Sequence, residues 1–205
     1  MRDYGGKTAE QRRAERRARL LDAGFALFGT QGYAATSVRA LLREAGLQDR
    51  YFAESFAGME ELLAEVYDKA HEAAFEEIID AVDPGATLVE RLHQMVEANA
   101  RKLETDPRYA RVALIEVLGA GPLVEKHRQR GLRQYADAVA SVLPQPQPQR
   151  GLDRTVVARA LVAGVNGVFT DWLTNSPSLT REQIVEHAML LVRGVLRETF
   201  EASVG

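Results

Sequence analysis

Two carboxylate–histidine pairs have the residue types and the spacing that could support metal chemistry. Asp68 and His71 are three positions apart, and so are Glu90 and His93. In a helix this spacing places both side chains on one face, as in carboxylate-bridged metal sites within four-helix bundles. A complete site also needs inward carboxylates from two further helices, and Glu90 is explained equally well as part of a helix cap. The main interpretation is therefore a protein without catalytic residues, metal or cofactor, and a metal-binding four-helix-bundle enzyme is an alternative.

A second chemically suggestive group is basic and lies near the amino terminus. It consists of Lys7, Arg12, Arg13, Arg16, Arg17 and Arg19. Clustered cations attract phosphate and release its counterions, although the same residues could form a solvated helix face paired with Glu10 and Glu15. Residues 1–58 carry 10 Lys/Arg and 7 Asp/Glu, a net charge of +3, whereas the whole chain has a net charge of −3. The positive charge is therefore concentrated in the amino-terminal part.

Length and composition favour a packed protein with one small module and one larger domain. The chain has 205 residues, of which 46% are hydrophobic and 27% charged, close to the average for globular proteins. It contains no cysteine, which excludes disulfides and thiolate metal sites. We find no apolar run approaching the ~20 residues that a membrane span requires, and the first residues are polar. These features predict a cytoplasmic protein with no membrane partner.

The elements that position these residues are predicted to be helices from end to end, so the fold class is all-α. Leu21, Phe25 and Phe28 mark a first helix that ends near Gly29 and Gly32. A short second helix follows at 38–45, capped by Thr36 or Ser37, and a third short helix carries Phe52 and Phe56. Further helices are expected at about 59–82, after the Thr87–Glu90 capping box, from Pro107 to the break at 119–122, and at 122–142.

The carboxy-terminal part is predicted to contain two strong helices after a proline-rich linker at 144–151. Each proline removes a backbone donor and disfavours helical geometry in the residue before it. Val157, Leu161, Val165, Val168 and Trp172 give the first helix a wide apolar face, and a capping box at Thr180–Gln183 opens the second. Together these helices have more apolar surface than one neighbour can cover, which favours a four-helix homodimer interface. Packing against helices of the same chain is the alternative.

Residues 36–56 have the pattern of a helix-turn-helix, in which a second short helix is presented to the major groove. At these residues the chain resembles the TetR (tetracycline-repressor) family. The resemblance rests on Leu20–Phe28, Gly32-Tyr33, Thr36–Val38, Ala45–Leu47 and Phe52–Phe56, and it covers residues 12–65 most strongly. It implies a domain of residues 1–58 that binds DNA and a domain of residues 59–205 for ligand binding and dimerisation. It also implies a homodimeric repressor that holds a palindromic double-stranded operator and is released by a small-molecule effector.

The resemblance assigns DNA contacts to individual residues. The expected DNA-binding residues are Arg16, Thr36, Ser37, Gln48, Arg50 and Tyr51. Thr36 matches a hydroxyl that contacts backbone phosphate, Gln48 opens the recognition helix, and Arg50 could contact guanine or phosphate. Ala53 and Met59 occupy positions where the family frequently has a tyrosine and a lysine that contact phosphate. Arg50, Tyr51 and the basic amino-terminal arm are candidates to replace those contacts.

Several polar side chains interrupt apolar stripes in the second domain and are candidate ligand-binding residues. A buried polar group without a partner costs about 1–3 kcal/mol, so such residues usually contact a partner or a ligand. The candidates are His93, Asn99, Glu116, Tyr135, Asn166 and the adjacent Phe169. Hydrogen bonds between neighbouring helices are the alternative explanation for the polar residues, and packing at the dimer interface is the alternative for Phe169. A DNA-binding protein with no effector is therefore a further alternative.

Overall fold

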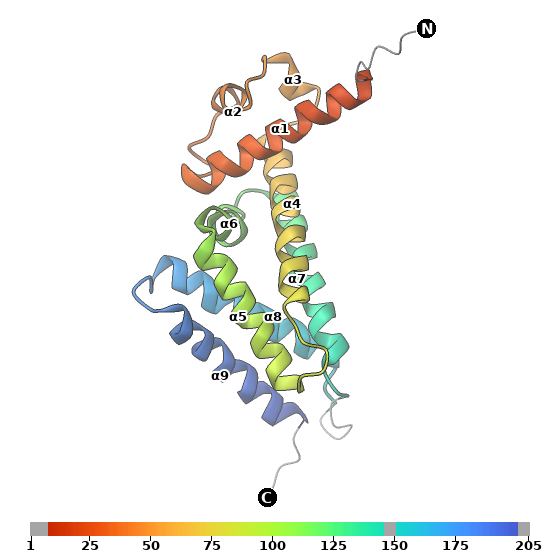
Figure 1. The fold of residues 1–205 in the computed structure, drawn as a ribbon, viewed down its shortest axis with the longest axis vertical. Helices are drawn as coiled ribbons and strands as arrows, with labels where there is room; N and C mark the ends of the chain where they lie inside the picture. The colour runs from red at the N-terminus through yellow and green to blue at the C-terminus, as the bar shows by residue number, and fades with distance from the viewer. Residues whose placement is uncertain (1–7, 146–150, 201–205) are drawn as a thin grey trace, which may run out of the picture.

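The computed structural model describes residues 8–145 and 151–200, which contain helices and no strand. The helices are α1 (Ala9–Thr30), α2 (Val38–Ala45), α3 (Arg50–Ala53), α4 (Met59–Asp80), α5 (Leu88–Thr105), α6 (Pro107–Arg111), the π-helix η1 (Val112–Glu116), α7 (Pro122–Val142), α8 (Arg154–Thr174) and α9 (Arg181–Phe200). Helices α1–α3 lie at one end of the molecule, and α4 and α7 run side by side away from them (Figure 1). The predicted all-α class is confirmed.

The local signals for helix ends account for the amino-terminal elements. A capping box starts α1, with the Thr8 side chain accepting from the Gln11 amide. Ser37 caps α2 by accepting from the Ala40 amide at 3.2 Å. Gly46 ends α2 in the left-handed conformation, at φ 59°, which glycine adopts without steric cost. The turn between α2 and α3 is therefore fixed by local chemistry.

Helix α3 is shorter than expected, because it ends before Phe56, which the sequence places on the third short helix. Asp49 precedes it without making a side-chain capping bond, and regular α-helix covers only Arg50–Ala53. Hydrogen-bonded turns extend the segment on both sides, through Tyr51 N to Gln48 O at 3.0 Å and Phe56 N to Phe52 O at 2.9 Å. Side-chain contacts with α1, described below, supply the support that the short helix lacks.

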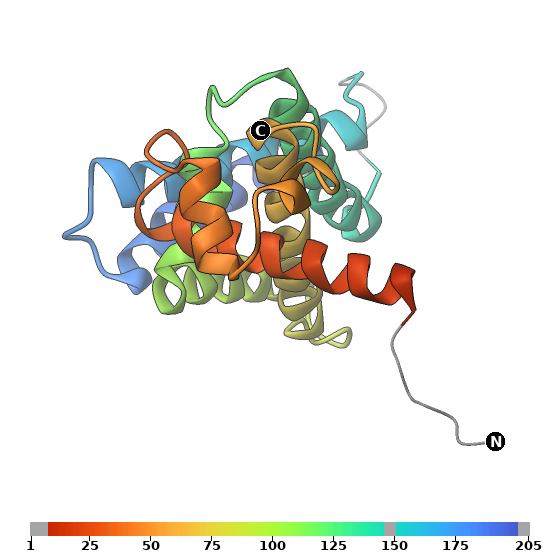
Figure 2. The ribbon, with the colours of Figure 1, turned by 90° about the horizontal axis from the view of Figure 1, so that it is seen from above.

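Two hydrophobic clusters form the core, and α4 contributes to both. The amino-terminal cluster joins α1–α3 to the first half of α4 and extends past residue 58 to Leu62, Leu63 and Val66. It also contains Val112, Val117 and Val124, which come from η1, the following turn and α7. The larger cluster joins the rest of α4 to α5–α9. Figure 2 shows α1–α3 gathered over one end of the bundle that the other helices form.

Helix α8 is unusually apolar for the amount of surface that it buries. By length and composition alone it could cross a membrane, with a mean hydropathy of 1.3 over its most apolar stretch, of which 28% is buried. The sequence analysis expected no apolar run of the length that a membrane span requires. Helix α8 comes close to such a run, because Arg154, Arg159 and Asp171 are its only charged residues. A helix that buries one face in its own protomer and a second face in a partner has the same composition. Most of the linker predicted at 144–151 lies outside the described residues.

Candidate DNA-binding surface and ligand cavity

Arginines of α1 hold the short α3 in place. Arg13 donates to the Glu54 backbone oxygen at 2.8 Å, and Arg16 forms an ion pair with the Glu54 carboxylate at 3.2 Å. The Arg17 guanidinium lies 4.7 Å from the Phe56 ring centroid and also pairs with Glu65 of α4. Such contacts remove conformational freedom from α3, so part of the amino-terminal basic cluster is structural.

Tyr51 lies between two arginines on the outer side of α3. The Arg16 and Arg50 guanidinium carbons are 4.4 Å and 4.8 Å from the Tyr51 ring centroid. Arg50 also donates to the Tyr51 hydroxyl at 2.9 Å, a bond that raises the pKa of Arg50 and keeps it charged. Gln48 and Arg50 are exposed and Tyr51 is half-buried. This arrangement presents a cation and an aromatic hydroxyl together at the surface.

The two hydroxyl residues before α2 have different surroundings. Ser37 is exposed while it caps α2. Thr36 is buried, with 8% of its surface exposed, and its hydroxyl donates to the Gly32 backbone oxygen at 2.7 Å. A phosphate contact by Thr36 would therefore need a local opening, whereas Ser37 can meet a phosphate without one.

A polar network joins the amino-terminal helices to η1. Arg111 donates to the Thr30 backbone oxygen at 2.9 Å and to the Glu116 carboxylate at 2.7 Å. The other oxygen of that carboxylate accepts from the Tyr33 amide at 2.6 Å. Nearby, α1 and α6 approach so closely that a Cβ on Gly29 would lie 2.5 Å from the Cβ of Arg108. We name the contacts among Arg111, Glu116, Thr30 and Tyr33 the η1 link.

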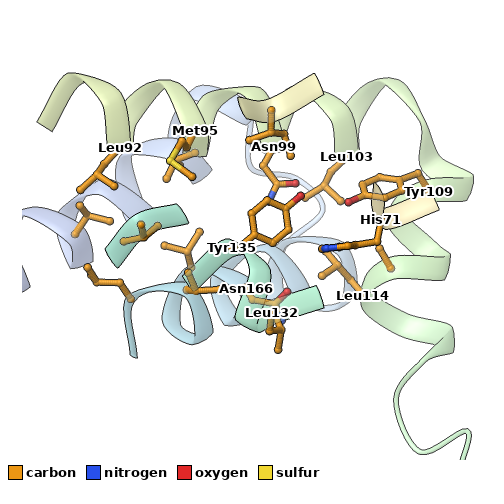
Figure 3. A pocket seen from close by; sticks show the side chains of 18 of the residues that line it. His71, Leu92, Met95, Asn99, Leu103, Tyr109, Leu114, Leu132, Tyr135 and Asn166 are labelled. Atoms are coloured by element: carbon orange, nitrogen blue, oxygen red, sulfur yellow. The ribbon is translucent and has the colours of Figure 1, made fainter. Parts of the chain in front are cut away.

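A cavity of about 90 Å³ lies within the larger helical cluster. Its lining includes Tyr67, His71 and Ile78 of α4, Leu92, Met95, Val96, Asn99 and Leu103 of α5, Tyr109 of α6, Ala113 and Leu114 of η1, Leu132, Tyr135 and Val139 of α7, Leu161, Val162, Val165 and Asn166 of α8, and Val192 of α9. His71, Tyr109, Tyr135 and Asn99 gather toward one end, and Leu92 and Met95 lie toward the other (Figure 3). The cavity therefore has a polar end and an apolar end.

Burial controls the protonation of the polar end. It lowers the pKa of His71, while a hydrogen bond with Gln134 at 3.1 Å opposes the shift. It raises the pKa of Tyr109 to about 12 and raises the pKa of Tyr135 further. The Tyr135 hydroxyl is buried beside the Tyr109 hydroxyl, an interaction that also raises the pKa of Tyr135, but the two are not placed for a hydrogen bond of regular geometry. Near neutral pH, all these groups are uncharged.

The cavity contains three of the six residues expected to bind a ligand: Asn99, Tyr135 and Asn166. Glu116 lies in the η1 link instead, Phe169 is buried in the core with 1% of its surface exposed, and His93 is not part of the lining. Sequence reasoning missed His71, Tyr67 and Tyr109 as lining residues. Tyr67 and His71 are four positions apart, so the sequence could have placed both on one face of α4. Nothing in the local sequence indicates which neighbouring helix that face contacts.

Three of the four members of the carboxylate–histidine pairs have other partners. Asp68 contacts His127 at 2.7 Å and also pairs with Arg130, while His71 contacts Gln134. Glu90 closes the capping box with Thr87. Within residues 8–145 and 151–200, no group of three or more His, Cys, Asp or Glu side chains is placed to hold a metal ion. This geometry does not favour the metal-enzyme alternative.

The amino-terminal segment matches a known family. Residues 20–66 match the model described as bacterial regulatory proteins, tetR family. This segment is therefore similar to the amino-terminal part of TetR-family proteins. No curated protein matches the chain.

Solved structures of TetR-like regulators share the fold over most of the chain. The fatty acid degradation regulator FadR from Bacillus halodurans is 16% identical with a TM-score of 0.71, covering 94% of this chain and 98% of that one. FadR from Bacillus subtilis, in complex with stearoyl-CoA, is 17% identical with a TM-score of 0.71, covering 85% and 96%. The multidrug binding protein EbrR, complexed with imidazole, is 20% identical with a TM-score of 0.70, covering 88% and 94%. The chain therefore has a TetR-like fold, with an amino-terminal helix-turn-helix and a carboxy-terminal helical domain.

Proposed function

We propose that this TetR-like chain is a cytoplasmic, homodimeric transcriptional repressor that binds a palindromic operator and releases it when a small molecule enters the cavity. In this proposal residues 1–58 bind DNA and residues 59–205 bind the effector and dimerise. The observation that carries the proposal is the exposed surface formed by Ser37, Gln48, Arg50 and Tyr51 on a helix-turn-helix braced by α1. Arginine beside an aromatic hydroxyl suits contact with a guanine edge and a neighbouring phosphate.

Exposed apolar surface on α8 and α9 supports the homodimer. Val156 of α8 is 59% exposed and Leu190 of α9 is 70% exposed, although both side chains are apolar. A Cβ added to Gly167 or Gly194 would meet nothing within 4 Å, so each glycine leaves room for a close-approaching helix. A twofold dimer through this face would place two α3 segments on one side, where successive major grooves are about 34–36 Å apart.

Two features favour an effector over a DNA-binding protein without one. If the polar residues of the second domain served only structure, they would hydrogen-bond to one another. The Tyr135 hydroxyl instead lies beside the Tyr109 hydroxyl without a hydrogen bond of regular geometry, and it lines the cavity with Asn99 and Asn166. In addition, η1 contributes Ala113 and Leu114 to the cavity and Glu116 to the η1 link. A movement of η1 would therefore change both the cavity and the η1 link. Helix α4, which contributes to both hydrophobic clusters, offers a second connection between the two domains.

Sequencing genomic fragments retained by the purified full-length protein, followed by gel-shift titration, tests DNA binding. Arg50→Ala is expected to weaken operator binding at least about tenfold, since a base contact contributes about 1–3 kcal/mol. Arg101→Ala is the matched control, because Arg101 is an exposed arginine of α5 that pairs with Glu97 and lies outside the helix-turn-helix. Equal affinity of the Arg50 and Arg101 variants would remove Arg50 from the DNA-binding surface. Failure to enrich any fragment would reject the regulator proposal.

Sedimentation of the full-length protein tests the dimer. Leu190→Glu is expected to yield monomers, because it places a charge in the centre of the proposed interface. Val89→Glu is the control, since Val89 is a similarly exposed apolar residue, 42% exposed, on α5. A wild-type monomer, or a dimer that survives Leu190→Glu unchanged, would contradict the proposed interface.

A further inference from the structure

The cavity lining has an unusual charge composition for a protein that is 27% charged. None of the residues that line the cavity is Asp, Glu, Lys or Arg. Its one histidine has a lowered pKa and its tyrosines have raised pKa values, so the lining is neutral near pH 7. An ion entering such a site loses its hydration shell without gaining a counterion, which disfavours carboxylates, phosphates and ammonium groups.

Aromatic rings could in principle substitute for a counterion by holding a cation against their faces. Here the ring faces already contact one another. His71 is stacked on both Tyr67 and Phe75, at centroid distances of 5.5 Å and 6.2 Å. Tyr135 meets His71 and Phe75 edge to face, at 5.1 Å in each case. This packing leaves no open aromatic cage, so a cation is disfavoured as well.

The polar end supplies a specific hydrogen-bonding requirement. The buried Tyr135 hydroxyl makes no hydrogen bond of regular geometry with its neighbour, the Tyr109 hydroxyl, and Asn99 lies at the same end of the cavity (Figure 3). A ligand oxygen that accepts a bond from Tyr135 would satisfy this donor, and the asparagine amide can serve a second contact. Leu92 and Met95, toward the other end, favour an apolar body.

The volume limits the size of that body. An engineered apolar cavity of about 150 Å³ holds benzene, and this cavity measures about 90 Å³. A single five- or six-membered ring is therefore near the upper limit, reached with small adjustments of flexible side chains such as Met95. A long acyl chain such as the stearoyl group exceeds it.

We infer that the effector is a compact, uncharged molecule of about one ring, largely apolar, with a carbonyl or similar oxygen that accepts a hydrogen bond from Tyr135. This inference rests on the proposed function for its regulatory meaning, but the binding preference itself does not depend on DNA. It separates this chain from its structural neighbour crystallised with stearoyl-CoA, despite the shared fold.

Calorimetric or ligand-observed NMR titration of the full-length protein tests the inference with four matched probes. They are cyclopentanone, its apolar isostere methylcyclopentane, the cation cyclopentylammonium and the anion cyclobutanecarboxylate; stearoyl-CoA is a fifth probe. Cyclopentanone is expected to bind at least about tenfold more tightly than methylcyclopentane, with no detectable binding of either ion or of stearoyl-CoA. Tyr135→Phe should reduce the ketone's advantage to less than about threefold, whereas Tyr33→Phe, outside the cavity, should preserve it.

Three results would overturn the inference: an ion or stearoyl-CoA binding as tightly as the ketone, an equal affinity for the ketone and the hydrocarbon, or no binding of any neutral probe. Operator binding, measured separately without probes, reports on the proposed function. If cyclopentanone binds through Tyr135 but the protein retains no DNA, the regulator proposal fails and the ligand class stands. If DNA is bound and the probe preferences are absent, the ligand class fails and the regulator proposal stands.

Discussion

Replacing Glu116 with glutamine should reveal how much the η1 link contributes to stability. Both carboxylate oxygens accept short hydrogen bonds, from Arg111 at 2.7 Å and from the Tyr33 amide at 2.6 Å, and the side chain is only 11% exposed. Hydrogen bonds to charged groups contribute about 1.5–3 kcal/mol. Glutamine keeps one acceptor oxygen but turns its amide hydrogens toward the other donor. Because Arg111 is 38% exposed and partly screened, we expect a loss of about 2 kcal/mol.

Thermal unfolding at fixed protein concentration measures this loss. For a chain of this length, about 2 kcal/mol corresponds to a fall in Tm of roughly 4–8 °C. Asp22→Asn makes the corresponding chemical change in a pair with Lys69, where both side chains are largely exposed, at 67% and 58%. The control should lower Tm by less than about 2 °C. If Glu116→Gln shifts Tm no more than Asp22→Asn does, the η1 link contributes no more than an ordinary surface ion pair and this reasoning is refuted.

Three further predictions concern close packing and burial. Gly29→Ala should lower Tm more than Gly58→Ala, because its Cβ would collide with Arg108, whereas a Cβ on Gly58 meets nothing within 4 Å; equal shifts would show that α1 and α6 separate easily. Gly131→Ala should also lower Tm, since its Cβ would lie 2.4 Å from the Tyr67 hydroxyl, and adding Tyr67→Phe should restore part of the loss; a double variant no better than the single one would contradict this contact. Folding lowers the pKa of His71, so the unfolded state binds more protons than the folded state as the pH falls below about 6.5. The free energy of unfolding, measured with urea, should therefore decline below that pH. His71→Gln should make this decline less steep, whereas His187→Gln should leave it unchanged.

The sequence was sufficient for elements whose ends are determined locally. Thr87 and Glu90 form the predicted capping box, and Gly46 ends α2 as its position suggested. The length of α3 was overestimated because periodicity identifies its apolar residues, Phe52 and Phe56, but not where α-helical geometry stops. The π-helical turn at Val112–Glu116 was missed altogether, since one extra residue per turn barely alters an apolar pattern.

Site residues in the second domain were less predictable, because a polar residue on an apolar helix can face several neighbours. Asn99, Tyr135 and Asn166 line the cavity as their positions suggested, whereas Glu116 belongs to the contact between the two clusters. The difference depends on the π-helical turn, which sequence periodicity does not report. His71 was considered only as a metal ligand, because its contacts with Gln134 and Tyr135 depend on how α4 is rotated against α7.

The position of η1 indicates how a small ligand could affect a distant DNA surface. Val112 is buried in the amino-terminal cluster, Ala113 and Leu114 line the cavity, and Glu116 bonds to Tyr33, all within five residues. A ligand shifts a conformational equilibrium only by its difference in affinity for the two states. A molecule that fits without displacing Leu114 would therefore bind without releasing DNA. A slightly larger ring that displaces Leu114 would strain the η1 link. In a series of ketones of increasing ring size, release of the operator should therefore begin abruptly at one ring size and should not follow the affinity of the ketones for the cavity.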